Sequence, residues 1–434
     1  MLNLSTLEQQ TLLPGTKGLA LTQPLQQQDI AQRQWNVLNG DTSFPVAVLK
    51  QTALQHNLQW MKKFCDTMHV VLAPHGKTTM SPQLFKMQLE NGAWGITLAT
   101  VNQTLIAHRF GVKRVLLANQ LISRSDTQAV LALMKADPQF EFLALTDSLE
   151  GVQRLAEQVR ASGLNRPLPL LVELGFPGGR TGCRSQADAL AIARAIHQSP
   201  YLQLAGIEGY EGLLVGKHRD QDLVAVRAFI NDLITLTQQA DAEGLFAGAN
   251  ILLSAGGSAY FDLVGRGFEQ TLQLSRPVTA ILRSGCYVTH DHGFYHHLLH
   301  EMHARESVVE VDNLRPALEV WSMVQSRPEP DLAILTMGKR DASYDIDLPF
   351  PVQTHRPGSA SFPRDLPSGC KIEKMNDQHA YLRLPRDSAI CETLQVGDLI
   401  ACGISHPCTT FDKWPVILVV DDHYQVQSAI NTFF

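Results

Sequence analysis

A lysine within the N-terminal third of the chain is the first residue whose side chain could act in catalysis. Lys77 stands in the segment PHGKTT (74–79), directly after a short apolar run. Most lysines are solvated surface charges. A lysine that is desolvated at a buried site, however, becomes a nucleophilic amine and can form a Schiff base. The residue alone leaves both interpretations open.

A histidine and a cysteine near the C-terminus, His406 and Cys408, are separated by one residue. On an extended segment they would point to the same side, so imidazole and thiolate could converge on an ion such as Zn²⁺. A buried cysteine beside an ordinary histidine fits the same spacing. A rival metal site is a His-rich stretch whose spacing singles out no coordinating set, and which we interpret as a polar loop at a domain junction (His290, His292, His296, His297, His300 and His303).

A glycine-rich segment, SAGGS (254–258), follows another apolar run. Gly256 and Gly257 would let backbone N–H groups approach a phosphate, and Ser254 and Ser258 would add hydroxyl donors. A plain tight turn explains a Gly-Gly pair equally well.

The elements that position these residues are eight short apolar runs with helical patterns between them. Continuous apolar runs are typical of strands buried on both faces, and their alternation with helices predicts a parallel sheet. Eight units predict an α/β fold, a closed (β/α)8 barrel of the TIM type over residues 46–295, with its site in the loops that follow the strands. The runs lie at 70–73, 94–99, 115–118, 142–145, 170–174, 204–210, 251–254 and 280–283.

One connecting helix shows its expected boundaries in the sequence. Thr146 or Asp147 is the expected N-cap, and Gly163 the expected end. After residue 295 the pattern alternates, at 306–313, 371–384 and 397–408, with Pro- and Gly-bearing connections near 327–330 and 349–368. We therefore expect a second, mostly β domain over 296–434, to which residues 1–45 contribute.

Composition excludes several classes of function. With 44% hydrophobic residues, 18% charged residues and a net charge of -6, the chain of 434 residues has no basic surface for nucleic acid. A small molecule is the expected partner. No apolar run reaches the length of about 20 residues that a membrane span needs, and the N-terminus lacks a signal-peptide pattern. We expect a cytoplasmic protein, whose seven scattered cysteines are not a disulfide framework.

Taken in order, these motifs resemble the D-serine dehydratase and D-threonine aldolase group of pyridoxal phosphate (PLP) enzymes, from about residue 45 to 425. The most specific segments are PHGKT, GIEGYEG, RSGCYVTHD, DASYDIDLP (341–349) and SHPCTTFDKW. The resemblance implies an alanine-racemase-type barrel with a C-terminal β domain. It also implies a homodimer, with DASYDIDLP as a candidate contact.

The resemblance also implies roles for single residues. Lys77 matches the lysine that holds PLP, and His406 with Cys408 matches a zinc pair. Tyr210 and Arg180 match residues that face the cofactor ring. The remaining matches form the phosphate cradle or lie near the ring nitrogen or the phosphate (Ser254, Gly256, Gly257 and Ser258 for the cradle; Arg283 and Tyr287 for the others).

The reaction that these matches imply is β-elimination from a D-3-hydroxy amino acid such as D-serine, D-threonine or 3-hydroxyaspartate. A His-x-Cys pair resembles the dehydratases, whereas aldolases more often carry His-x-Asp. Retro-aldol cleavage to glycine and an aldehyde, racemisation, a PLP-carrying regulatory role and a cofactor-free metal lyase stay open as alternatives.

Overall fold

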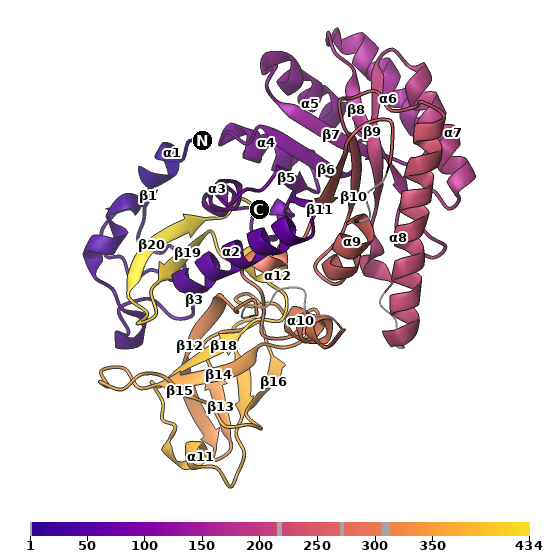
Figure 1. Ribbon diagram of the computed structural model, residues 1–434. Coiled ribbons are helices and arrows are strands. Elements are labelled where there is room, and N and C mark those ends of the chain that lie inside the picture. Colours follow the sequence, from indigo (N-terminus) through magenta and orange to yellow (C-terminus); the bar gives the residue numbers. More distant parts are fainter. Residues whose placement is uncertain (1, 215–218, 270–272, 306–312) are drawn as a thin grey trace.

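The computed structural model describes residues 2–214, 219–269, 273–305 and 313–434. Figure 1 shows two lobes: strands surrounded by helices form one, and a β-rich lobe lies below it. No helix in the described ranges combines the length and the apolar character that a membrane crossing requires.

The first lobe is built on the eight predicted strands. Each hydrogen-bonds in parallel to its neighbours, in the order β4-β11-β10-β9-β8-β7-β6-β5. Every apolar run of the sequence therefore coincides with a strand. Their bounds are β4 (Val71–Leu72), β5 (Ile96–Leu98), β6 (Arg114–Gln120), β7 (Glu141–Thr146), β8 (Leu168–Leu174), β9 (Leu202–Gly209), β10 (Ile251–Ala255) and β11 (Val278–Leu282).

The two edge strands, β4 and β5, meet through the residues beside them. The N–H of Trp94 donates to the carbonyl of Leu72 at 2.7 Å, and that of Thr97 donates to Pro74 at 2.9 Å. His75 and Thr97 form a parallel bridge. These bonds close the curled sheet, so the predicted barrel is confirmed.

Helices cover the outside of the barrel (Figure 1). The helix after β7 corrects one prediction: Ser148 is its N-cap and accepts from the N–H of Gly151, because Thr146 is still in the strand and Asp147 accepts from Gly182 instead. Its expected end at Gly163, with φ of 67°, is confirmed. The helices are α2 (Gln51–Thr67), α3 (Pro82–Glu90), α4 (Val101–Arg109), α5 (Arg124–Ala136), α6 (Leu149–Ser162), α7 (Gln186–Gln198), α8 (Arg219–Ala242) and α9 (Phe261–Phe268).

The second lobe is a ten-stranded sheet, antiparallel except where β19 runs parallel to β3. A mostly β second domain is confirmed. Its strands are β3 (Val46–Lys50), β12 (Leu318–Glu329), β13 (Leu332–Leu335), β14 (Phe350–His355), β15 (Arg364–Asp365), β16 (Lys371–Met375), β17 (Ala380–Arg383), β18 (Leu399–Gly403), β19 (Val416–Val420) and β20 (Val426–Asn431), with the short helix α11 (Ala389–Thr393).

Strand β3 begins directly after the expected boundary at residue 45 but pairs in this second sheet. Its partner β12 follows the whole barrel in the sequence. Leu49 pairs with Leu318, and Val46 pairs with Trp321. The chain thus leaves the β lobe, forms the whole barrel and returns to the neighbouring strand.

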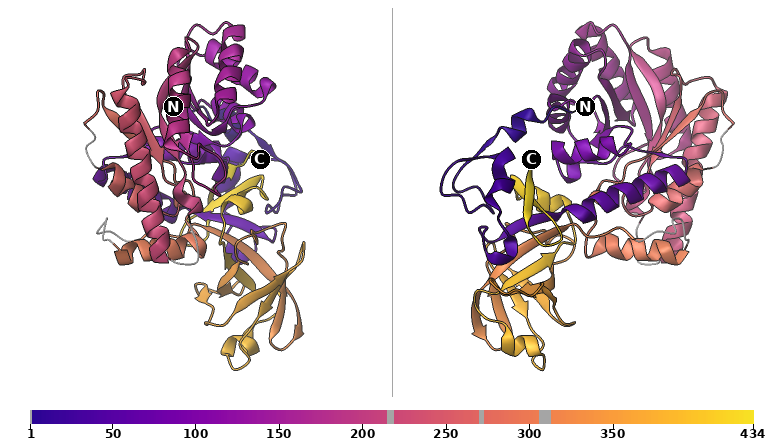
Figure 2. Two further views of the ribbon diagram at one scale, coloured as in Figure 1. Left: turned by 90° about the vertical axis from the view of Figure 1, so that its right-hand side faces the viewer. Right: turned by 60° about the vertical axis from the view of Figure 1, so that its left-hand side comes forward.

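The N-terminal segment packs on the β lobe, and Figure 2 shows it beside the C-terminal strands. Leu12, Ile30 and Trp35 share a buried cluster with Val48 and Trp321. It contains α1 (Ser5–Glu8), η1 (Gln27–Arg33), η2 (Val37–Asn39) and a separate two-stranded sheet, β1 (Thr11–Leu12) with β2 (Leu25–Gln26).

Three loop predictions need correction. The stretch 349–368 holds β14 and β15, since a bulge at Pro351 lets β14 pair with β18 despite the proline. The connection near 327–330 is mostly β12. Part of the His-rich stretch is the helix α10 (Phe294–Arg305). The alternating stretch at 306–313 lies outside the described residues except for Asn313.

One glycine of the barrel wall gives a stability prediction. A Cβ at Gly206 on β9 would overlap the backbone carbonyl of Leu252 on β10. Gly206→Ala should therefore lower the free energy of unfolding by about 1–3 kcal/mol, measured by urea denaturation. Gly248→Ala is the control, because its Cβ would lie 3.1 Å from the flexible end of Gln203 and 3.3 Å from the backbone carbonyl of Asn250, without the overlap that Gly206 shows. Equal effects of the two substitutions would contradict the argument.

Candidate active site

A cavity of about 430 Å³ lies where the barrel strands end and the β lobe returns onto them. Its size suits a small-molecule ligand. Most of the predicted site residues line it: Lys77, Arg180, Tyr210, Gly257, Ser258, Arg283, His406 and Cys408. Residues that we did not predict also line it, among them His75, Glu173, Glu208, Cys286 and Tyr295.

Lys77 enters the cavity from the turn η3 (Gly76–Thr78). The turn needs Gly76, because a Cβ there would come within 2.8 Å of Phe85 and Ile96. The Lys77 side chain is exposed to this open space. Lys77 therefore stands at the mouth of the barrel, in a cavity rather than on the outer surface.

The cavity also has a buried, charged lining. Arg283 and Glu208 are 3% and 1% exposed and form an ion pair, and Arg283 Nη2 donates to the carbonyl of Gly209 at 2.7 Å. Burial raises the pKa of Glu208 to about 8, against the opposing effect of Arg283. Burial, followed by the charge of Lys77, holds the pKa of His75 well below its usual value. A neutral imidazole therefore faces this lining.

Several polar atoms of this lining have no hydrogen-bond partner within the described ranges. They are Nδ1 of His75, Oε2 of Glu208 and Nε of Arg283. Buried polar groups are rarely left unpaired without a reason such as a ligand. The lining thus keeps polar groups free for an occupant of the cavity.

Two predicted residues of the same cavity lie together. The guanidinium carbon of Arg180 is 5.4 Å from the centroid of the Tyr210 ring, within the range of a cation–π interaction. Burial raises the pKa of Tyr210. Tyr210 is therefore neutral at physiological pH and presents a hydroxyl donor and an aromatic face.

The glycine-rich segment is held by a carboxylate that the sequence did not reveal. Glu211, fully buried in η4 (Glu211–Leu213), accepts from the N–H groups of Gly256 and Gly257, each at 2.9 Å. Ser254 donates to the carbonyl of Ile281 at 3.2 Å. In this structure Gly257 and Ser258 line the cavity, whereas Ser254 and Gly256 do not.

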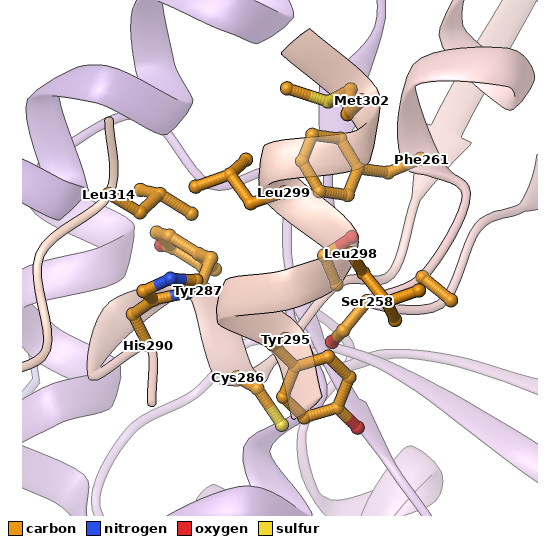
Figure 3. Close-up of a pocket in the computed structure, with 12 residues that line it drawn as sticks. Ser258, Phe261, Cys286, Tyr287, His290, Tyr295, Leu298, Leu299, Met302 and Leu314 are labelled. Carbon is orange, nitrogen blue, oxygen red and sulfur yellow. The ribbon is translucent and has the colours of Figure 1, made fainter. Parts of the chain in front are cut away.

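Tyr287 is also placed outside the main cavity. It lines a second, mostly apolar cavity of about 10 Å³ behind the first, drawn in Figure 3. That volume holds about one water molecule, so it is no substrate site. The Tyr287 hydroxyl accepts from Gln88 Nε2 at 3.4 Å.

His406 and Cys408 reach the cavity by a different backbone path from the one expected. The segment is not extended, because Pro407 has helical dihedrals and Cys408 begins the short helix α12 (Cys408–Phe411). Both side chains nevertheless line the cavity with Lys77. The sulfur of Cys408 lies 3.4 Å from Thr78 Oγ1 and 3.6 Å from the sulfur of Cys286.

Asp345 holds the imidazole of His406. Its Oδ2 lies 2.6 Å from Nδ1 of His406, and its Oδ1 accepts from Thr409 at 2.9 Å. Burial by itself lowers the pKa of His406, but Cys408 and Asp345 outweigh it and raise that pKa to about 9. The Cys286 thiol, against burial, holds the pKa of Cys408 well below its usual value.

Asp345 belongs to the segment DASYDIDLP, which the sequence singled out only as a candidate dimer contact. The bond engages Nδ1 of His406, so Nε2 is the nitrogen through which the ring would ligate a metal. Across the described ranges, no three His, Cys, Asp or Glu side chains are gathered into a metal site, and this includes the described part of the His-rich stretch. A metal bound by His406 and Cys408 would therefore need further ligands that are not side chains of this pair.

Two known families match this chain, one over the barrel and one over the β lobe. Residues 49–265 match the family described as alanine racemase, N-terminal domain. Residues 317–420 match a serine dehydratase domain.

Relatives extend over nearly the whole chain. A D-threonine aldolase from Arthrobacter sp. is 24% identical over 407 residues, which cover 94% of each chain. The structure of a D-threonine aldolase from Filomicrobium marinum is similar with a TM-score of 0.74 and 22% identity, over 90% of this chain and 95% of that one. A cysteine-to-alanine variant of D-threo-3-hydroxyaspartate dehydratase in the metal-free form has a TM-score of 0.72 and 20% identity, over 92% and 99%.

The Glu211 contacts give a second stability prediction. A glutamine offers one carbonyl oxygen and one NH₂ group, so Glu211→Gln leaves either Gly256 or Gly257 with an unpaired N–H. We expect the free energy of unfolding to fall by about 1–3 kcal/mol. Glu269→Gln, which removes an exposed ion pair with Arg266, is the control and should cost under about 1 kcal/mol. Identical urea midpoints for wild type and Glu211→Gln would contradict the stabilising role of the two Glu211 hydrogen bonds.

Proposed function

The chain belongs to the alanine racemase N-terminal domain family, joined here to a serine dehydratase domain, and we propose that it is a PLP- and zinc-dependent lyase. It removes the 3-hydroxyl group of a D-amino acid such as D-serine, D-threonine or 3-hydroxyaspartate, and yields a keto acid and ammonia. The observation that carries this proposal is the single cavity shared by Lys77 of the barrel and by His406 and Cys408 of the β lobe.

The residues of the cavity fit PLP. Lys77 offers the amine that binds the aldehyde, Ser258 and Gly257 line the wall for the phosphate, and the unpaired atoms of His75 and Arg283 offer polar partners for the ring. When bound, PLP supplies an electron sink for negative charge at the substrate Cα. Beside a bound substrate, the Lys77 amine would remove the Cα proton and hold it.

The donor set of the second domain fits zinc. Imidazole and thiolate are both ligands that Zn²⁺ prefers, and Asp345 supplies the outer contact that orients a ligating histidine. When bound, the ion supplies a Lewis acid for the leaving hydroxyl group. His406 and Cys408 would hold it at the mouth of the barrel, in the cavity that Lys77 also lines.

Retro-aldol cleavage is the second candidate function. It is favoured by the D-threonine aldolase relative, which aligns with 94% of this chain. Cys408 favours elimination. A thiolate at that position selects Zn²⁺, the Lewis acid proposed for the leaving hydroxyl group, whereas a carboxylate would admit harder ions.

The proposed assembly is a cytoplasmic homodimer with DASYDIDLP (341–349) at the contact. Two exposed apolar side chains of that segment, Tyr344 and Ile346, support it.

Lys77→Ala should abolish turnover and the borohydride-reducible link between protein and PLP, because the variant lacks the amine that forms it. Visible absorbance spectra and a keto-acid assay measure both. Lys86→Ala, at a partly exposed position of α3, is the matched control. A reducible PLP link that survives in Lys77→Ala would overturn this assignment.

Cys408→Ala should lose zinc and elimination while it keeps the PLP absorbance. Asp345→Asn should weaken zinc binding by about 10–100-fold, because it loosens the imidazole that His406 presents. Competition with a chromophoric chelator measures both affinities. Asp347→Asn is the control, since Asp347 contacts Ser405 Oγ at 2.9 Å in the same loop. An enzyme that contains no zinc, or whose rate chelators leave unchanged, would exclude the metal role.

D-threonine distinguishes the two reactions. Elimination gives 2-oxobutanoate and ammonia, whereas retro-aldol cleavage gives glycine and acetaldehyde. We expect the keto acid as the main product in a coupled assay with both readouts. Acetaldehyde as the main product would establish the aldolase instead.

A further inference from the structure

Two cysteines from different domains meet in the cavity. Cys286 begins the turn η5 (Cys286–Val288) after the last barrel strand, and Cys408 begins α12 of the β lobe. Their sulfur atoms are 3.6 Å apart. We propose that Cys286 and Cys408 are a site of reversible oxidation, at which hydroperoxides form a disulfide that links the barrel to the β lobe.

The geometry needs only a small movement. A disulfide has an S–S length of about 2.05 Å, so the sulfurs must approach by roughly 1.5 Å. Cys286 lies in a short turn and Cys408 at the start of a four-residue helix, and both line the cavity. Thr78 Oγ1, at 3.4 Å from Cys408 and 3.9 Å from Cys286, completes the cluster and aligns the two sulfurs.

Small oxidants can reach this pair. Both cysteines line the cavity of about 430 Å³, and Cys408 is partly exposed whereas Cys286 is 4% exposed. In Figure 3 the sulfur of Cys286 points to the side of Tyr295, away from Leu314. Cys65, Cys183 and Cys402 are buried and do not line this cavity. Oxidation should therefore begin at Cys408.

The chemistry balances with hydrogen peroxide as the oxidant. The sulfur of Cys408 attacks one peroxide oxygen, the O–O bond breaks, and the other oxygen leaves as water after it takes a proton. The sulfur of Cys286 then displaces the hydroxyl group from the resulting sulfenic acid, so that the S–S bond forms and a second water leaves with the Cys286 proton. Two thiols lose two electrons, and one peroxide becomes two waters.

The disulfide would have two effects on the enzyme. It ties the mouth of the barrel to the β lobe across the space that substrate must enter. It also removes the Cys408 thiolate, so that His406 alone remains of the zinc pair. The second effect rests on the proposed function, whereas the disulfide itself does not.

The test treats the full-length protein, loaded with PLP and zinc, with hydrogen peroxide. A digest without reductant is then analysed by mass spectrometry for a peptide that joins Cys286 to Cys408 and weighs two hydrogens less than the separate peptides. We expect this linked peptide to accumulate in step with the loss of lyase activity and with zinc release. Dithiothreitol should reverse all three.

Two variants sharpen the test. Cys286→Ser removes the second thiol, so dimedone should trap a sulfenic acid on Cys408 and no linked peptide should form. Cys391→Ser, which removes a thiol outside the cavity, should leave the formation of the link unchanged. Peroxide inactivation of the wild type with both thiols intact, or with Cys408 linked to another cysteine, would overturn the proposal. A linked peptide in a protein that lacks zinc or lyase activity would support it and refute the proposed function instead.

Discussion

The pairing of β3 with β12 is the constraint on which the rest of the molecule depends. Four residue pairs, from Val46–Trp321 to Leu49–Leu318, join the strand that precedes the barrel to the strand that follows it. Because the chain leaves and re-enters one sheet at adjacent positions, the barrel is fixed to the β lobe at both of its ends. The carboxyl ends of its strands can then meet α12 in one defined arrangement.

Sequence-distant contacts stabilise that arrangement. Cys408 touches Thr78, 330 residues earlier in the chain, and His406 is held by Asp345, 61 residues earlier. The imidazole is raised in pKa and the thiol is lowered, so that each favours the charged state of the other. The cavity therefore combines an amine from the barrel with a polarised pair from the β lobe, although neither lobe contains both.

The sequence predicts the framework of this protein better than its contacts. The eight barrel strands are readable because strands buried on both faces are apolar without interruption. Lys77, His406 and Cys408 are readable because they stand beside strand ends in a recognisable order. Strand β14 is hidden by Pro351, which a bulge accommodates, and α10 by the histidines that obscure its apolar positions. Glu211 and Asp345 are missed because their partners lie far away in the chain.

The carboxylate of Glu211 has a consequence for how ligands associate with this protein. It already satisfies the N–H groups of Gly256 and Gly257, so the loop after β10 has its shape before any phosphate arrives. An incoming anion then loses little entropy to loop ordering, which favours fast and tight association with a rigid surface. The same carboxylate repels an anion that approaches too closely. An anion held at this loop would therefore lie on the cavity side, where Ser258 lines the wall, rather than in the barrel interior.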